Sequence, residues 1–297
     1  MTLNRREFLW QAGALTAGVM LAPQLVQAAT KPRIGLQLYT CRQLLDQDLN
    51  GTLKQIASIG YKELESASGA KGHYYGMKPK ELSNMVADMG MKLRAHHVTA
   101  GRIPQAGQPV QTDPTRMTLF DGLQQHVDMA AEAGLSYLVC SSSNFSNLDE
   151  LKRVIELFNR AGEACKKAGM TFAFHNHDRE FKPMEGQIPY ELMLSQTDKD
   201  LVKFELDLFW ILKAGTDPVD MFKKNPGRYA LWHVKDMDNT ENKNFTEIGN
   251  GTIDFKPIFA AAKTSGMKYF FVEQDRTPGN PLDSIAISYK NLSKVLA

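Results

Sequence analysis

The chain alternates between short apolar runs and longer amphipathic segments from residue 31 to its end. The apolar runs have the length of buried strands, and the amphipathic segments repeat their apolar residues at helical spacing. Strands are predicted at 34–39, 61–65, 92–98, 137–140, within 171–178, and at 202–207, 229–234 and 268–273. Helices are predicted at 53–59, 79–89, 116–133, 149–168, 188–196, 217–224, 254–265 and 282–296.

Eight strands that alternate with eight helices are typical of one closed (β/α)₈ TIM barrel. The alternative is a doubly wound open sheet, which would need a glycine-rich turn after the first strand. The sequence at that point is Tyr39-Thr40-Cys41-Arg42, which has no glycine. The pattern therefore predicts a single barrel domain over residues 31–297.

The fifth predicted strand ends in a cluster of polar groups. An apolar run from Thr171 to Phe174 is followed directly by His175, Asn176, His177 and Asp178. In a parallel barrel the carboxyl ends of the strands form the mouth where sites are built. Histidines that only bond loop carbonyls are the alternative, but two histidines and an aspartate within four residues favour a site.

Other predicted strands also end in acidic groups or histidine. Four of these side chains come from four consecutive strands: His175, Asp207, His233 and Glu273. Two imidazoles and two carboxylates suit one divalent ion such as Mn, Co, Zn or Mg. An ion pair between Glu273 and Lys235 is the alternative for that glutamate. Glu65, His96 and Lys235, at or just beyond the ends of strands two, three and seven, are expected to line the same mouth and bind substrate.

The first 28 residues have the features of a targeting segment rather than of a fold. Asn4-Arg5-Arg6-Glu7-Phe8-Leu9 resembles a twin-arginine export signal, and a weakly apolar stretch at 12–22 follows it. Val26-Gln27-Ala28 has compact residues where a signal peptidase would cut. The stretch is shorter than the roughly 20 residues of a spanning helix. We therefore expect a periplasmic or exported protein with no stable membrane insertion after removal of the signal.

Charge and cysteine content limit the kinds of binding partner that the sequence predicts. The formal net charge of +2 gives no electrostatic reason to bind nucleic acid, and so argues against a DNA-repair endonuclease of the same barrel class. Three widely spaced cysteines imply no disulfide framework. A small-molecule substrate remains, and a homo-oligomer stays open.

Several motifs resemble the xylose-isomerase-like family of barrels, which includes sugar isomerases and epimerases and inosose dehydratases. The resemblance covers the whole chain after the export segment. It rests on the segments 35–39, 206–207 with 214–218, 233–237, 248–255 and 271–275. In that family a divalent ion is held by Glu, Asp, His and Glu at strands five to eight. Asp207, His233 and Glu273 match the last three positions, whereas His175 replaces the glutamate of strand five.

This replacement changes the expected chemistry. Epimerases of the family use both glutamates as bases, and an imidazole bound to a metal cannot accept a proton. The resemblance still implies a metal that polarises a sugar carbonyl, with Glu273 or His177 moving protons through an enediolate. The expected export favours an unphosphorylated sugar or keto-sugar, because phosphosugars are cytoplasmic metabolites. His175, His177 and Glu273 are therefore the predicted catalytic residues.

Two other activities stay open. The same groups would serve a lyase or hydratase acting on 3-keto-glycosides or keto-sugars, and a periplasmic sugar-binding protein without catalysis is more remote. Trp210 could stack on a sugar, although core packing of this ring is as good an interpretation. Lys235 and Arg276 are expected to bind substrate oxygens, or else to be solvated charges at the rim.

Overall fold

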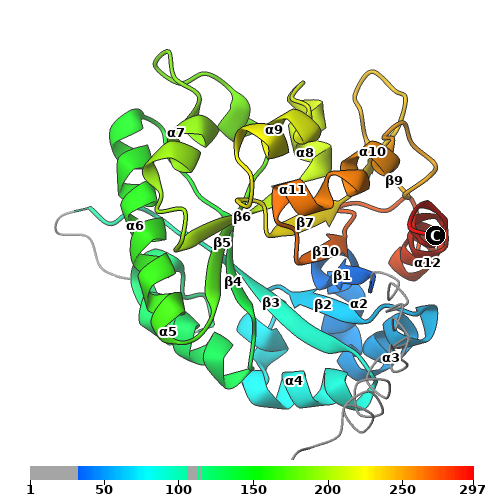
Figure 1. The fold of residues 1–297 in the computed structure, drawn as a ribbon. Helices are drawn as coiled ribbons and strands as arrows, with labels where there is room; N and C mark the ends of the chain where they lie inside the picture. Colours follow the sequence, from blue (N-terminus) through cyan, green and yellow to red (C-terminus); the bar gives the residue numbers. More distant parts are fainter. Residues whose placement is uncertain (1–32, 106–112, 114) are drawn as a thin grey trace, which may run out of the picture. The chain divides into compact units, whose positions relative to one another are not determined.

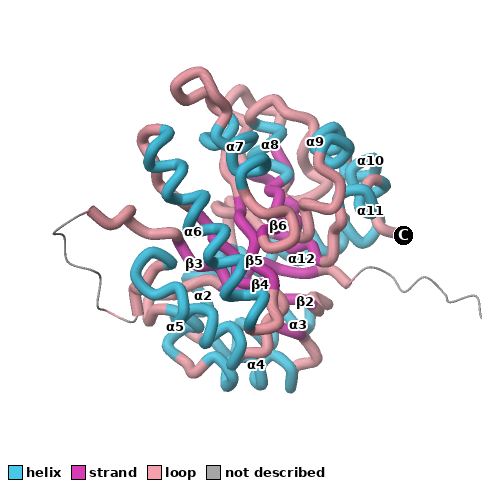
Figure 2. The backbone as a smooth tube through the Cα atoms, turned by 60° about the vertical axis from the view of Figure 1, so that its left-hand side comes forward, coloured by secondary structure: helices cyan, strands magenta, loops and turns pink. Residues whose placement is uncertain are grey.

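The computed structural model describes residues 33–105, 113 and 115–297. Within them, parallel strands close into a barrel in the order β1-β10-β7-β6-β5-β4-β3-β2, so the predicted single (β/α)₈ barrel is confirmed. Figure 1 shows the barrel, and Figure 2 shows its strands enclosed by helices. The predicted export segment, residues 1–28, lies outside the described residues.

The barrel strands are short, with three to eight residues each. In chain order they are β1 (Gly35–Gln37), β2 (Glu63–Ser66), β3 (Lys92–Thr99), β4 (Tyr137–Ser142), β5 (Thr171–His175), β6 (Val202–Asp207), β7 (Leu231–Val234) and β10 (Tyr269–Val272). A separate antiparallel pair, β8 (Asp236–Met237) with β9 (Phe245–Thr246), lies in the segment that follows β7. The sequence pattern predicted no strand in this segment.

Helices follow the strands along the chain. They are α2 (Arg42–Gln47), α3 (Leu49–Ile59), α4 (Pro79–Asp88), α5 (Leu119–Glu132), α6 (Leu148–Lys167), α7 (Pro189–Gln196), α8 (Leu208–Lys213), α9 (Pro218–Lys224), α10 (Phe255–Ala260), α11 (Ala262–Ser265) and α12 (Pro281–Val295). Three single turns of 3₁₀ helix are η1 (Leu38–Cys41), η2 (His73–Gly76) and η3 (Arg179–Phe181). No helix of the described ranges is long and apolar enough to cross a bilayer.

Successive side chains of a strand face opposite sides of the barrel wall. Leucines and phenylalanines of the outer side, such as Leu138 and Phe174, pack in the core beneath the helices. Inside the barrel, Val139, Ala173 and Phe271 belong to a smaller apolar cluster. Above that cluster the interior becomes polar, and the functional groups begin there.

One acidic side chain fixes the loop after β7. The carboxylate of Asp236 accepts hydrogen bonds from the backbone N–H groups of Gly249, Gly251 and Ile253, at 2.8, 3.2 and 3.1 Å. A Cβ at Gly251 would lie 2.3 Å from the Asp236 carboxylate, so only glycine fits there. The two motifs at 233–237 and 248–255 therefore lock together beside the mouth of the barrel.

Candidate active site

Four buried side chains converge at the carboxyl ends of β5, β6, β7 and β10. They are His175, Asp207, His233 and Glu273, and one ligand atom from each lies within 4.8 Å of the others. Each is at most 5% exposed. The parallel register of neighbouring strands accounts for this, because it pairs Asp207 with His233 and brings the strand ends to one level.

The ring of His175 turns a lone pair toward this group. Its Nδ1 lies 3.1 Å from the carbonyl oxygen of Ser141, and a carbonyl only accepts, so Nδ1 carries the proton. Burial, with His233 nearby, lowers the pKa of His175 to about 4, so the ring is neutral. Its other nitrogen, Nε2, then faces Oδ2 of Asp207 at 3.1 Å with a lone pair. Two lone pairs facing each other are stable when a cation lies beside both.

His233 has the same arrangement with its nitrogens exchanged. Nε2 donates to Oε2 of Glu65 at 2.7 Å. Nδ1 is fully buried and forms an ion-pair contact with Oε2 of Glu273 at 2.8 Å that lacks hydrogen-bond geometry. A histidine that ligates a metal through one ring nitrogen usually donates the N–H of its other nitrogen to a carboxylate, which fixes the tautomer and the orientation of the ring. Glu65 is that carboxylate for His233.

The donor set therefore fits a divalent cation. Two imidazole nitrogens and two carboxylate oxygens are ligands of Zn and of related ions. Without an ion, burial alone would lower the pKa of His233, but Glu205 and Glu273 outweigh it and raise the pKa well above its ordinary value, so the ring is charged and Nδ1 pairs with Glu273. A divalent ion would take the place of that proton between the imidazole and the carboxylates. His175, Asp207, His233 and Glu273 are the residues that would hold it.

A lysine already supplies one positive charge to the carboxylates. Nζ of Lys235 lies 2.9 Å from Asp207, 2.6 Å from Glu273 and 3.0 Å from Asp275, and the side chain is 1% exposed. The ion pair between Lys235 and Glu273 that the sequence suggested is therefore present. Lys235 is not a solvated charge at the rim of the barrel, because its side chain is buried. Three carboxylates and one ammonium leave a net charge of −2, so the charge of the site does not exclude a divalent ion.

These charges shift one another's pKa values. Burial by itself raises the pKa of Asp207 and of Glu273, but the Lys235 ammonium outweighs it and holds both well below their ordinary values. Burial alone would lower the pKa of Lys235, and Asp207, Asp275 and Glu273 instead raise it well above its ordinary value. The three groups are therefore ionised across the physiological pH range.

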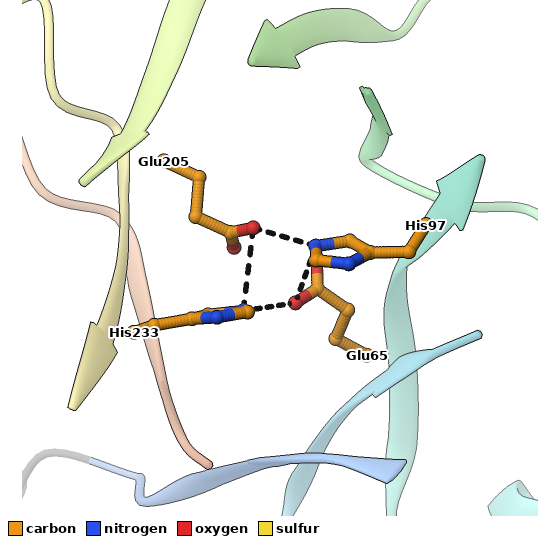
Figure 3. A group of neighbouring side chains, drawn as sticks. All are labelled: Glu65, His97, Glu205 and His233. Atoms are coloured by element: carbon orange, nitrogen blue, oxygen red, sulfur yellow. Dashed lines mark hydrogen bonds and ion pairs between the residues drawn. The ribbon is translucent and has the colours of Figure 1, made fainter. Parts of the chain in front are cut away.

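A second cluster lies inside the barrel on the other side of His233. Figure 3 shows Glu65, His97, Glu205 and His233 facing one another, and all four are buried. Nε2 of His97 lies 2.7 Å from Oε2 of Glu205 and 3.2 Å from Oε2 of Glu65, and Nε2 of His233 lies 3.3 Å from Glu205. The shortest contacts have hydrogen-bond geometry, so protons on the two rings account for this cluster.

Two carboxylates so close together differ in acidity. Burial by itself raises the pKa of Glu65, but His97 and His233 outweigh it and lower the pKa to about 2. Burial and the charge of Glu65 raise the pKa of Glu205 to about 7. Burial alone would lower the pKa of His97, whereas Glu65 and Glu205 raise it to about 9. The cluster therefore holds an imidazolium on His97 that Glu65 and Glu205 stabilise.

A cavity of about 610 Å³ opens over the site. His97, His175, His177, Glu273 and Asp275 line it on the side of the clusters. Its other lining residues come from the ends of β3 and β4, from the segments after β1 and β2, and from the segment before α5: Tyr39, Ala67, Ser68, Gly69, Ala70, Gly72, His73, Thr99, Thr115, Arg116, Met117, Ser141 and Ser142. This size and this polar lining suit a small polar ligand.

The remaining predicted residues lie in different places. His96 points out of the barrel, with its ring stacked on Tyr74 at 4.1 Å and bonded to Ser66 Oγ at 2.8 Å. Glu65 lies inside the barrel beneath the cavity and reaches the site through His233. Arg276 is exposed and does not line the cavity.

Trp210 and His177 pack against each other next to the site, with ring centroids 5.6 Å apart. Trp210 also packs on Phe245 and does not line the cavity, which is the core-packing alternative. His177 does line the cavity, and its ring lies edge-on to His175 at 5.0 Å. Burial lowers the pKa of His177 to about 4, so this ring is neutral.

Sequence reasoning did not select His97 and Glu205. Glu205 precedes Asp207 by two residues, so period-two alternation puts both on the inner side of β6. The sequence alone could therefore have selected Glu205. Alternation does not place His97, because the pairing of β3 with β2 has an irregular register between Leu64 and Glu65.

The fold and the site together define a closed (β/α)₈ barrel with metal-capable donors at the carboxyl ends of its strands. Residues 53–293 match the Xylose isomerase-like TIM barrel family. The chain belongs to this family.

Named relatives agree with this assignment. The inosose dehydratase of Lacticaseibacillus casei is 27% identical over 154 residues, which are 46% of this chain and 51% of that protein. The chain thus spans about half the length of the curated relative that it matches. The structure of a sugar phosphate isomerase/epimerase from Parabacteroides distasonis is 30% identical, with a TM-score of 0.73, and covers 90% of this chain and 95% of its own. The IolI protein, solved with a zinc atom, shares the fold at 15% identity and a TM-score of 0.67, covering 89% of this chain and 98% of its own.

Proposed function

We propose that the protein is a divalent-metal-dependent isomerase or epimerase that moves a proton next to the carbonyl of an unphosphorylated sugar or keto-sugar. The observation that carries the proposal is the convergence of four buried donors from His175, Asp207, His233 and Glu273, whose ligand atoms all lie within 4.8 Å of one another. This group lies directly beneath a polar cavity, because His175 and Glu273 line that cavity.

When bound, the ion would act as a Lewis acid that polarises a substrate carbonyl. His175, Asp207, His233 and Glu273 would hold it. The Lys235 ammonium, 2.6 Å from Glu273, is placed to stabilise negative charge that develops on a substrate oxygen as an enediolate forms. His177 lines the cavity and is available to move a proton on a substrate hydroxyl.

A lyase or dehydratase acting on a keto-sugar or 3-keto-glycoside is the second candidate. The relative from Lacticaseibacillus casei is an inosose dehydratase. Such a reaction needs one group to remove a proton beside a carbonyl and another to protonate the leaving oxygen. The neutral His177 and the charged Lys235 lie near the same site and supply these two kinds of group.

Charge at the mouth supports a substrate without phosphate. Glu273 and Asp275 line the cavity beyond β10, where phosphate sites of barrels are often built. Arg116 is the one arginine or lysine among the described lining residues. We also propose export through the segment at 4–9, which would bring the protein to unphosphorylated sugars outside the cytoplasm.

The deciding experiment is solvent exchange. Metal-replete protein is incubated with a panel of keto-sugars and glycosides in deuterated water, and deuterium on carbon is measured by mass spectrometry. Deuterium next to a carbonyl, lost after chelation and restored by added metal, is expected. A new double bond would identify the lyase. Substrate binding without exchange, bond cleavage or metal in the protein would refute both and indicate a sugar-binding protein.

A further inference from the structure

Tyr39 is an aromatic side chain that lines the cavity and stays exposed. It is 38% exposed, and Ile287 of α12 is the other large apolar side chain that is exposed among the described residues. A single exposed ring needs no explanation on an open surface, but a ring in a cavity wall is available to a bound molecule. Trp210, which the sequence offers as a stacking ring, packs on Phe245 and does not line this cavity.

Arg42 fixes the orientation of the Tyr39 ring. The guanidinium carbon of Arg42 lies 4.1 Å from the ring centroid, over one face of the ring. Nη1 of Arg42 also donates hydrogen bonds to the carbonyl oxygens of Tyr39 and Asp275, at 2.9 and 3.2 Å. Because Arg42 covers one face, the opposite face and the edge of the ring are the parts that a molecule in the cavity can contact.

The cavity extends to both sides of Tyr39. β1 pairs with β10 on one side and with β2 on the other, and Figure 1 shows it between them. On the β10 side the cavity wall contains Glu273, which is one of the proposed metal ligands. On the β2 side the wall contains Ala67, Ser68, Gly69, Ala70 and Gly72. The segment 67–72 therefore borders a part of the cavity that lies beyond Tyr39 from Glu273.

The segment 67–72 forms a fixed turn, and its lining residues are small. The backbone N–H groups of Gly69 and Gly72 each donate to the carbonyl oxygen of the other residue, at 3.0 Å. The N–H of Ala70 donates to Oδ1 of Asp46 at 2.8 Å. A Cβ at Gly69 would lie 2.5 Å from the same oxygen, so this position requires glycine. Hydrogen bonds thus hold this wall in place, and its small side chains leave the space in front of it open.

Ser68 supplies this side of the cavity with a polar group of fixed orientation. Nε2 of His73 lies 2.9 Å from the carbonyl oxygen of Met117, which only accepts, so Nε2 carries the proton. Burial lowers the pKa of His73, so the ring is neutral and its Nδ1 is an acceptor. The Ser68 hydroxyl, at 2.9 Å, is nearer to Nδ1 than Nε2 of His96 is, at 3.2 Å. When the Ser68 hydroxyl donates to Nδ1, its oxygen keeps lone pairs for a hydroxyl group of a ligand.

We propose that this part of the cavity binds a second ring joined to the reacting sugar. We name it the outer subsite, formed by Tyr39, Ser68, His73 and the turn 67–72. Tyr39 is the platform on which the second ring stacks, and Ser68 accepts a hydrogen bond from a hydroxyl that this ring carries. The inference rests on the proposed function and narrows the substrate to a glycoside. A monosaccharide is smaller than the drug-sized ligands that cavities of about 300–1,000 Å³ enclose, so one sugar at the metal donors leaves part of the cavity of about 610 Å³ unfilled.

The second ring must present a flat apolar face to Tyr39. An aromatic aglycone would stack ring on ring, and a second sugar would place its C–H groups on the tyrosine. The two kinds of ring differ at Ser68, because a sugar offers hydroxyl donors there and an unsubstituted phenyl group offers none. A disaccharide and a phenyl glycoside of the same keto-sugar therefore distinguish them.

The test measures kcat/KM in the deuterium-exchange assay for a keto-sugar of the panel, its phenyl glycoside and a disaccharide that carries it. Wild type should favour at least one glycoside over the free keto-sugar by roughly 10- to 100-fold, the effect expected for burying an aromatic ring. Tyr39→Ala should lose most of this preference and keep its metal content, whereas Tyr39→Phe should retain the preference. The glycoside with the higher kcat/KM identifies the second ring.

Ile287→Ala is the matched control, because Ile287 is 41% exposed on α12 and does not line the cavity. Its preference should equal that of wild type. Ala70→Phe places a ring in the outer subsite, so it should lower kcat/KM for the glycosides more than for the free keto-sugar. If Tyr39→Ala does not fold, Ala70→Phe decides, and an unchanged preference in that variant overturns the subsite.

Two results would overturn the outer subsite and leave the proposed function standing. One is a kcat/KM for the free keto-sugar that equals or exceeds those for both glycosides, and the other is an unchanged preference in folded Tyr39→Ala. A wild type that exchanges none of the three substrates overturns the proposed function instead. Calorimetry with the phenyl glycoside then tests the subsite by itself, because equal affinity of wild type and Tyr39→Ala overturns it.

Discussion

Nζ of Lys235 lies 2.6 Å from Oε2 of Glu273 and thereby puts a buried ammonium beside the proposed metal ligands. The same nitrogen is 2.9 Å from Asp207. A divalent ion bound by these carboxylates would lie close to that charge. Lys235 therefore both stabilises the site without a metal and opposes the entry of one, which makes its replacement informative.

Lys235→Met should strengthen divalent-metal binding and weaken catalysis. Removing the ammonium removes the repulsion of the ion, while Asp207, Glu273 and Asp275 keep their charge. Without metal, the three unpaired carboxylates should destabilise the fold by about 3–5 kcal/mol. Turnover should fall roughly 10²- to 10³-fold, because a donor to the developing oxyanion is lost. Metal titration by calorimetry checks this, and weaker binding would show that Lys235 orients the ligands instead of competing with the ion.

Asp207→Ala should abolish metal binding and activity together. Its carboxylate lies at the centre of the donor set, next to both His175 and Lys235. His177→Ala is the comparison: it should keep wild-type metal content and still lower turnover, because its ring lines the cavity and supplies no ligand. Elemental analysis of both purified variants beside wild type gives the answer. A wild-type metal content in Asp207→Ala would contradict the proposed set of metal ligands.

Glu65→Gln should lower metal affinity 10- to 100-fold, the usual cost of losing the partner of a metal-ligating histidine. The change removes the charged acceptor, 2.7 Å from His233 Nε2, that holds Nδ1 toward the ion. Glu63→Gln is the matched control, since Glu63 lies two residues earlier and pairs with Arg33 and Arg94 instead. Competition with a chromogenic chelator measures both variants, and equal effects would indicate general loosening of β2.

The metal-free protein should lose stability as pH rises from about 6.5 to 9. The pKa of His97 rises from 6.5 in the unfolded chain to about 9 in the fold, so its contribution is complete below pH 6.5 and is lost as pH passes 9. A pKa shift of this size corresponds to about 3 kcal/mol in the free energy of unfolding. Urea unfolding of chelator-treated protein across this range measures it. His97→Gln should flatten the curve, and an unchanged slope would assign the loss to another group.

The sequence by itself determined the barrel and the level of the site. Apolar runs at regular intervals specify buried parallel strands, and such strands bring their carboxyl ends to one mouth wherever they lie in the chain. That rule alone brings together His175, Asp207, His233 and Glu273, which are far apart in sequence. It also gives Glu205 the same facing as Asp207, by simple alternation along β6.

Only the tertiary structure decided which histidine of β3 faces the interior. Leu93 packs in the outer core and Ala95 in the inner cluster, although regular alternation would put both on one side. The irregular register beside Glu65 reverses the facing between them, so His97 turns inward and His96 outward. Local propensity does not encode such a reversal, because it arises from how β3 pairs with β2. The direction of Lys235 was likewise decided by distant parts of the chain, since Asp207 and Glu273 surround its charge only after the barrel has closed.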